Sequence, residues 1–131
     1  PGEMGRLLGQ PVSHVQGSRV EVARRAATEW GQVVVLKGAH TVIASPNGLT
    51  AVSPFANPAL ASAGTGDVLA GIVGALLAQG LAPYDAAKLG VHVHAAAAER
   101  VSRRVGTSGL LASDLHTEIP IVMARLRGAP A

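Results

Sequence analysis

The sequence predicts an α/β protein that is half of a larger domain, on three observations. A continuous β-branched run at residues 33–36 is typical of a buried strand, and two more strand-like segments follow it. Apolar residues recur at helical spacing on both sides of these strands. Two or three strands are too few to cover that many apolar helices in a parallel α/β sheet. We therefore expect the other half of the domain to lie before Pro1 or to come from another chain.

The composition fits one packed domain. The 131 residues suit a single domain, or part of one, and leave no room for two. Because 48% of them are apolar, we expect a buried core. The absence of cysteine excludes disulfides, a thiolate nucleophile and cysteine-based zinc sites. A chain without disulfides suits a reducing compartment, and we expect a cytoplasmic location.

The composition also argues against nucleic-acid and membrane partners. One Trp, one Tyr and one Phe are too few to stack on bases, and the basic residues behind the net charge of +3 are scattered. The longest apolar run, residues 68–78, is about half of what a membrane-spanning helix needs.

Before the strands, we predict two helices separated by a loop. Pro1 opens a short helix, and residues 9–17 are polar and broken, which is typical of a loop. The second helix begins after Ser18, which forms a capping-box pattern with Glu21, and Gly31 ends this helix.

The strands and the later helices follow in order. Strands are predicted at 33–36, 41–44 and 49–53, separated by turns at 37–40 and 45–48. A helix of about 13 residues then ends near Gly80, and its small residues, Gly71 and Gly74 among them, would let it approach another element closely. The last two helices are predicted from about 83 to 105 and from 113 to about 127, and Pro120 should kink or split the second.

The most informative segment is Gly64-Thr65-Gly66-Asp67, at the start of an apolar helix. Glycines at a helix start leave backbone N–H groups accessible, and the helix dipole adds partial positive charge. Residues 64–66 would therefore form a pocket for a phosphate or a developing anion. Asp67 in the first turn is placed to accept a proton from a hydroxyl. Alternatively, Asp67 only stabilises the helix through its dipole, by about 0.3–1 kcal/mol.

The spacing excludes two commoner glycine motifs. Leu69 stands where a dinucleotide fingerprint needs glycine or alanine, and Ile72 stands where a P-loop needs lysine.

A second segment of interest is Lys37-Gly38-Ala39-His40-Thr41. A lysine at the end of a buried strand points toward the sheet edge where α/β proteins usually bind ligands. Lys37 and the backbone at Gly38 could there meet a nucleotide phosphate. The alternative is a plain turn with an exposed lysine.

Three further polar residues have structural interpretations. His92 and His94 stand two residues apart on a helix and point to different faces, so we expect each to pack in the helix bundle rather than to bind metal. Asp114 follows Ser113 and is expected to cap the last helix.

Residues 57–71 resemble the signature of the ADP- or ATP-dependent NAD(P)H-hydrate dehydratases, which belong to the ribokinase-like superfamily. Pro1-Gly2-Glu3, Lys37–Thr41 and Gly109–Leu115 resemble the same family in matching order, and His94 falls where the family commonly has a histidine. The resemblance implies that residues 1–131 are the C-terminal portion of a single ribokinase-like (carbohydrate kinase-like) domain with a three-layer α/β/α architecture, its N-terminal portion missing.

The resemblance also implies an activity, namely removal of water from hydrated NADH or NADPH (the 6S epimer). Phosphoryl transfer from ADP or ATP drives this repair, with release of AMP and phosphate when ADP is used. The substrate-binding residue and catalytic base would be Asp67, and Gly66 would lie beside the nucleotide's phosphates. The residues implied in nucleotide contact are Lys37, Gly38, Ala39, His40 and Thr41. Magnesium is expected with the phosphates although no residue is an evident ligand, and a homo-oligomer, a tetramer or larger, is expected.

Two other functions stay open. A kinase of the same superfamily, acting on a vitamin precursor or a sugar, would use the same aspartate as base. A non-catalytic nucleotide-binding fragment would use the same amides. The family's motif also has a substrate-binding histidine directly before the Pro-Gly-Glu stretch, whereas this chain begins at Pro1, so residues 1–131 alone should be inactive.

Overall fold

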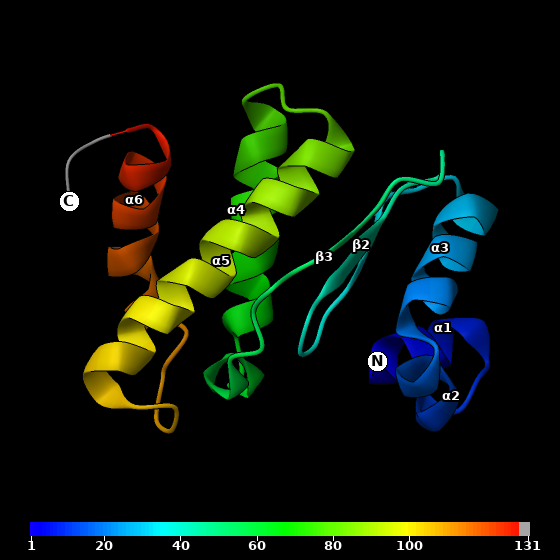
Figure 1. Cartoon of the computed structure of the whole chain (residues 1–131), viewed down its shortest axis with the longest axis horizontal. Helices are drawn as coiled ribbons and strands as arrows, with labels where there is room; N and C mark the ends of the chain where they lie inside the picture. Colours follow the sequence, from blue (N-terminus) through cyan, green and yellow to red (C-terminus); the bar gives the residue numbers. More distant parts are fainter. Residues whose placement is uncertain (129–131) are drawn as a thin grey trace. The chain divides into compact units, whose positions relative to one another are not determined.

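A computed structural model describes residues 1–128, which form two compact units (Figure 1). The first unit comprises Pro1–Ala56 and the second begins at Asn57. No helix among the described residues is both long and apolar enough to cross a membrane.

The first unit contains three helices and a small sheet. Its elements are α1 (Gly2–Leu8), α2 (Val12–Gly17), α3 (Arg19–Trp30), β1 (Val34–Leu36), β2 (Val42–Ala44) and β3 (Thr50–Val52). The sheet order is β1-β2-β3 and both pairings are antiparallel, with Ile43 opposite Val35 on one side and Ala51 on the other. The three predicted strands are confirmed, and the third pairs with the second as a hairpin.

Helix α3 packs on β1 and β2 through small residues. Ala23, Ala26 and Ala27 are fully buried or nearly so, and they meet buried strand residues such as Leu36 and Val42 in one core. Methyl-sized side chains let the helix pack close to the sheet.

Two predictions for this unit are wrong. Residues 12–17, predicted as loop, form α2, because Pro11 with a φ of −66° starts a helical turn and Val15 is fully buried beneath it. One buried residue in a single turn leaves no periodicity to detect. Ser18 occupies the N-cap of α3 but makes no side-chain capping bond, since it also ends α2 and its backbone is bent to join the two helices. The glycine stop at Gly31 is confirmed, with a left-handed φ of 63°.

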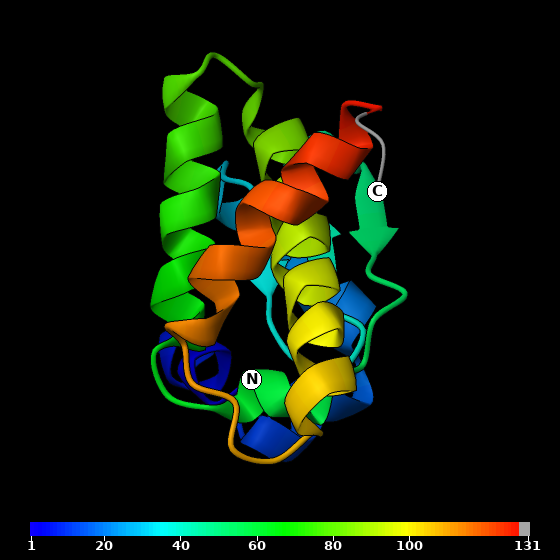
Figure 2. The ribbon, with the colours of Figure 1, turned by 90° about the vertical axis from the view of Figure 1, so that its left-hand side faces the viewer.

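The second unit is helical. It comprises the short 3-10 helix η1 (Pro58–Ala61), which the sequence pattern does not predict, and α4 (Thr65–Ala78), α5 (Pro83–Val105) and α6 (Asp114–Leu126). The three predicted helices are confirmed. Helix α5 packs against both α4 and α6, as Figures 1 and 2 show. The core residues Val93, Val101, Leu110 and Leu115 are buried between these elements.

Two details of these helices differ from expectation. Pro120 lies inside one continuous helix, so the predicted split is wrong. Because proline has no N–H, the carbonyl of His116 is left without its helical donor. Both residues are exposed, so water can bind this carbonyl. Gly71 and Gly74 of α4 face open space within the described residues. The close helix approach is made instead by Gly90 of α5, where an added Cβ would lie 2.6 Å from Cγ2 of Val73.

Candidate functional site

The start of α4 is built on a backbone conformation that favours glycine. Gly64, its N-cap, has a φ of 81°, in the left-handed region. A Cβ at Gly64 would also lie 3.2 Å from the Cβ of Ala112, in the loop before α6. The chain therefore needs glycine at this position both to turn and to pass close to its neighbour.

The first residue of α4 is fixed from inside the unit. Thr65 is 3% exposed, and its hydroxyl lies 2.8 Å from the carbonyl oxygens of both Leu60 and Ser62. Nε2 of His94 lies 2.8 Å from the carbonyl oxygen of Thr65. These contacts anchor the first turn of α4 to η1 on one side and to α5 on the other.

Two of the three predicted anion-binding amides are available. Among residues 1–128, the N–H groups of Gly64 and Gly66 donate to no protein acceptor. The N–H of Thr65 donates a long hydrogen bond of 3.4 Å to the Ser62 carbonyl. The expectation of an unbonded amide is therefore wrong for Thr65. At a helix start, unbonded amides favour an anion.

Asp67 lies in the first turn of α4 and faces solvent. Its carboxylate is exposed and makes no hydrogen bond or ion pair with residues 1–128. It lines one end of a cleft of about 590 Å³ between α4 and α6, a volume typical of small-molecule sites. The walls are mainly apolar and are formed by residues that include Val68, Ile72, Leu76, His116, Ile119 and Met123.

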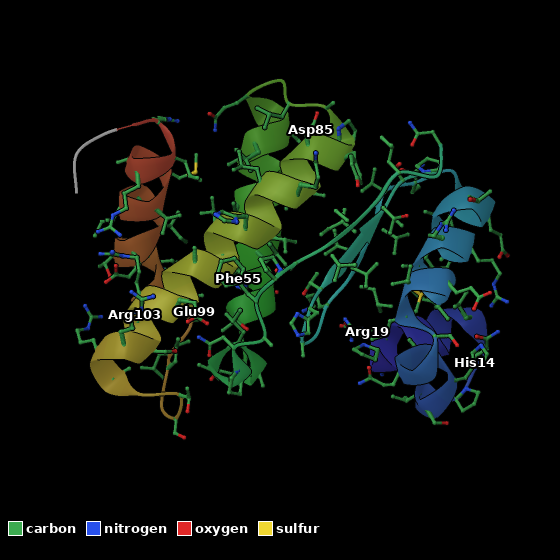
Figure 3. The ribbon with its side chains drawn as sticks, viewed as in Figure 1. His14, Arg19, Phe55, Asp85, Glu99 and Arg103 are labelled. Atoms are coloured by element: carbon green, nitrogen blue, oxygen red, sulfur yellow. The ribbon has the colours of Figure 1, made fainter. Side chains whose placement is uncertain are left out.

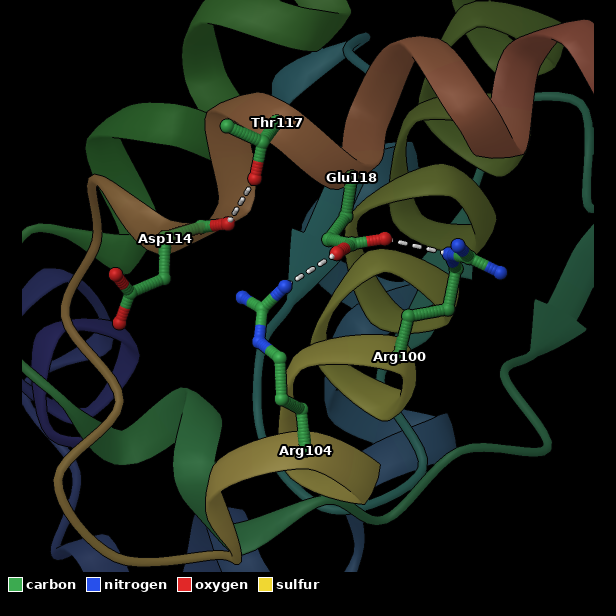
Figure 4. Close-up of polar contacts among 5 residues, drawn as sticks. All are labelled: Arg100, Arg104, Asp114, Thr117 and Glu118. Carbon is green, nitrogen blue, oxygen red and sulfur yellow. Dashed lines mark hydrogen bonds and ion pairs between the residues drawn. The ribbon is translucent and has the colours of Figure 1, made fainter.

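The loop before α6 is braced next to Gly64. The N–H of Leu111 donates to Oδ2 of Asp114 over 2.8 Å. This contact holds the loop that carries Ala112. The prediction that Asp114 caps α6 is wrong, because the N-cap is Ser113 and Asp114 is the first residue of that helix. Figure 4 shows Asp114 at the start of α6, where its carbonyl accepts a hydrogen bond from the Thr117 hydroxyl.

The two histidines of α5 occupy different environments. His94 is 6% exposed, as expected of a histidine packed in the bundle, whereas His92 is exposed and that expectation is wrong for it. The described residues contain no group of three or more His, Cys, Asp or Glu side chains that could hold a metal ion.

In the first unit, Lys37–Thr41 forms a loop with two unusual backbone angles. Gly38 has a φ of 148° and His40 a φ of 53°. The Thr41 hydroxyl donates to the Gly38 carbonyl over 3.0 Å, and the His40 N–H donates to the Phe55 carbonyl over 2.9 Å. Lys37 and Ala39 are exposed on this loop.

Arg19 holds this loop, a role that the sequence pattern does not indicate. Its Nη2 donates to the carbonyls of Leu36, over 3.0 Å, and His40, over 3.5 Å (Arg19 is labelled in Figure 3). A Cβ at Gly38 would collide with the same guanidinium. Partial burial lowers the pKa of Arg19 from its ordinary value. A lone arginine at the start of a helix carries no signal in the sequence that distinguishes it from a solvated one.

Comparison with known proteins places this geometry in a family. The family model described as NAD(P)H-hydrate dehydratase matches residues 1–121. A bifunctional NAD(P)H-hydrate repair enzyme Nnr of Moorella thermoacetica is 46% identical over 126 residues, which are 96% of this chain and 24% of that protein. An ADP-dependent (S)-NAD(P)H-hydrate dehydratase of Neisseria meningitidis is 44% identical over 88% of this chain and 39% of its own length.

A solved structure agrees with these relatives. The ADP/ATP-dependent NAD(P)H-hydrate dehydratase of Bacillus subtilis, co-crystallised with ATP/Mg²⁺, matches with a TM-score of 0.91 and 39% identity over 95% of this chain and 45% of its own. The match confirms the α/β class. The chain thus spans about a quarter of the bifunctional relative and less than half of the other two proteins. The chain belongs to the NAD(P)H-hydrate dehydratase family.

Proposed function

We propose that residues 1–131 are the C-terminal portion of a ribokinase-like domain in a protein that dehydrates hydrated NADH or NADPH, using ADP or ATP. The main support is the first turn of α4, where an exposed Asp67 stands next to the unbonded amides of Gly64 and Gly66. The relatives support the substrate, since they are named for NAD(P)H-hydrate dehydration or repair.

In the proposed reaction, Asp67 is both the substrate contact and the general base. It takes the proton of the ring hydroxyl while that oxygen bonds to the terminal phosphorus of the nucleotide. The bond from phosphorus to the bridging oxygen breaks, which releases AMP when ADP is used. The phosphate on the ring then leaves with the electrons of its C–O bond, and loss of a proton from the neighbouring carbon restores the double bond.

The amides at the start of α4 stabilise the negative charge that develops during phosphoryl transfer, the first step. Gly64 and Gly66 offer N–H donors at the positive end of a helix dipole. The cleft beside Asp67 provides an apolar wall, which suits a ring better than it suits a phosphate. Phosphate is a far better leaving group than hydroxide, so phosphorylation makes the elimination possible.

The nucleotide contacts are proposed for Lys37–Thr41 and Gly66. The Bacillus subtilis relative was co-crystallised with ATP/Mg²⁺, and the described residues offer no cluster of metal ligands. We therefore propose that magnesium arrives with the nucleotide's phosphates. The homo-oligomer and the cytoplasmic location expected from the sequence stay predictions.

The test compares Asp67→Asn with Asp85→Asn in the complete protein. Each aspartate is the third residue of its helix and exposed, so the two substitutions remove the same dipole interaction. We expect Asp67→Asn to lower turnover at least about a hundredfold, the usual contribution of a general base, while ADP binding persists. Asp85→Asn should leave turnover unchanged.

The products decide among the candidate functions. A dehydratase releases phosphate and restores the absorbance of reduced nicotinamide, whereas a kinase yields a stable phosphomonoester. Equal effects of the two substitutions would contradict the role of Asp67. An unmutated protein that binds ADP but neither dehydrates NAD(P)H hydrate nor phosphorylates a vitamin precursor or sugar would indicate the non-catalytic alternative.

A further inference from the structure

His94 is a buried polar residue for which the proposed reaction has no direct use. It lies in the middle of α5, 6% exposed, between the buried residues Val93 and Ala95. Its Nε2 lies 2.8 Å from the carbonyl oxygen of Thr65. Because a carbonyl oxygen can only accept, Nε2 must carry the hydrogen and donate it.

The acceptor of this bond belongs to a particular peptide unit. The Thr65 carbonyl and the Gly66 N–H lie in one rigid plane, on opposite sides of the same C–N bond. Fixing the carbonyl oxygen therefore fixes the direction in which the Gly66 N–H points. A donor on the carbonyl also polarises the peptide and makes its N–H a stronger donor.

The remaining contacts of Thr65 remove the freedom that would undo this effect. The Thr65 hydroxyl binds at the carbonyls of Leu60 and Ser62, each 2.8 Å away, and the residue is buried. The Gly66 N–H, by contrast, has no protein acceptor among residues 1–128. The carbonyl of this peptide unit is thus held by His94 of α5. Its N–H, on the opposite side of the C–N bond, is available to a ligand.

We propose that His94 is a positioning residue that directs and strengthens the Gly66 amide for the nucleotide's phosphates. This proposal rests on the proposed function, because it assumes that a phosphate meets Gly66. A purely structural role would make the histidine a satisfied core residue that contributes only to folding.

The test uses two variants of the complete protein and a matched control. His94→Leu removes the donor, and His94→Gln retains an N–H donor on a side chain of similar reach. His92→Leu makes the same chemical change two residues away on the exposed side of α5. The readouts are the amide resonance of Gly66 in glycine-labelled protein, and the affinities for ADP and adenosine.

We expect His94→Leu to move the Gly66 amide-proton resonance to lower frequency and to weaken ADP binding by up to about tenfold, the effect of losing the hydrogen bond between Gly66 and phosphate outright. Adenosine affinity should not change, because adenosine has no phosphate to meet the amide. His94→Gln should recover part of both effects, and His92→Leu should show neither.

Two results would overturn the proposal. One is an unmoved Gly66 resonance in His94→Leu. The other is an equal loss of ADP and adenosine affinity, which would indicate general loosening of the fold. These results differ from failure of the proposed function, in which the unmutated protein itself would not dehydrate hydrated NADH or NADPH.

Discussion

Glycines in this chain have opposite roles that only their surroundings reveal. Gly64 combines a left-handed φ of 81° with a neighbour 3.2 Å from its would-be Cβ. Gly74, ten residues along the same segment, lies within a helix and has nothing within 4 Å. The first glycine is required by the backbone, whereas the second lowers helix stability relative to alanine.

This contrast gives a prediction for stability. Gly64→Ala should lower the free energy of unfolding by about 1–3 kcal/mol, because a β-carbon strains the left-handed backbone and meets Ala112. Gly74→Ala should raise it by up to about 1 kcal/mol. Denaturant unfolding of both variants measures the two values. Equal effects of the two substitutions would contradict the requirement at Gly64.

Individual site residues were predictable from sequence only where local pattern defined them. Gly64-Thr65-Gly66-Asp67 was found because glycines before an apolar run indicate an accessible helix start. Arg19 was missed because its partners, the carbonyls of Leu36 and His40, lie 17 and 21 residues away in sequence. The contact of His94 with Thr65 spans 29 residues and was missed for the same reason.

Ion pairs join helices α5 and α6, and the sequence alone does not show which charged residues pair. Glu118 of α6 is 6% exposed. Its Oε2 lies 2.6 Å from Nε of Arg100, and its Oε1 lies 3.2 Å from Nη1 of Arg104 (Figure 4). The two arginines are partly or largely exposed, so the carboxylate is the group that depends on the pairing.

Replacing this carboxylate should therefore weaken the packing of the two helices. We expect Glu118→Gln to lower the free energy of unfolding by about 1–2 kcal/mol, since the arginines can recover hydration and the amide keeps one acceptor. Asp85→Asn breaks the exposed pair with Lys88, 2.9 Å long, and should cost much less. Thermal or denaturant unfolding compares them. A Glu118→Gln variant as stable as Asp85→Asn would contradict the role of the buried pair.

Element boundaries were predictable where several signals agreed. Helix α5 has a proline in its first turn and a long apolar stripe, and the structure places it at the predicted residues 83–105. Helix α2 and η1 are too short to show periodicity, so the sequence could not reveal them. Pro120 does not split its helix, because that helix face is exposed, which the sequence does not show.

For the protein as a whole, counting strands against helices was more informative than any single element. The sheet has three short strands, and α4 keeps Gly71, Gly74 and Ala75 exposed. The solved relative is about twice as long as this chain. These facts support the proposal that further strands complete the domain. The antiparallel pairing of all three strands was predictable only for the second and third, where a Pro-Asn-Gly turn joins them.

The proposed division of roles between the loop 37–41 and Asp67 predicts that substitutions in them affect different steps. In the complete protein, Lys37→Met should weaken ADP binding about tenfold or more, because it removes a charged donor to phosphate. Turnover at saturating ADP should change only a few-fold, since the base at Asp67 is intact. Lys88→Met, which removes an exposed lysine from α5, should change neither quantity. Steady-state kinetics with varied ADP separates the two effects. If Lys37→Met binds ADP as tightly as Lys88→Met does, the loop is a structural turn that Arg19 braces. A positively charged group other than Lys37 must then bind the nucleotide's phosphates.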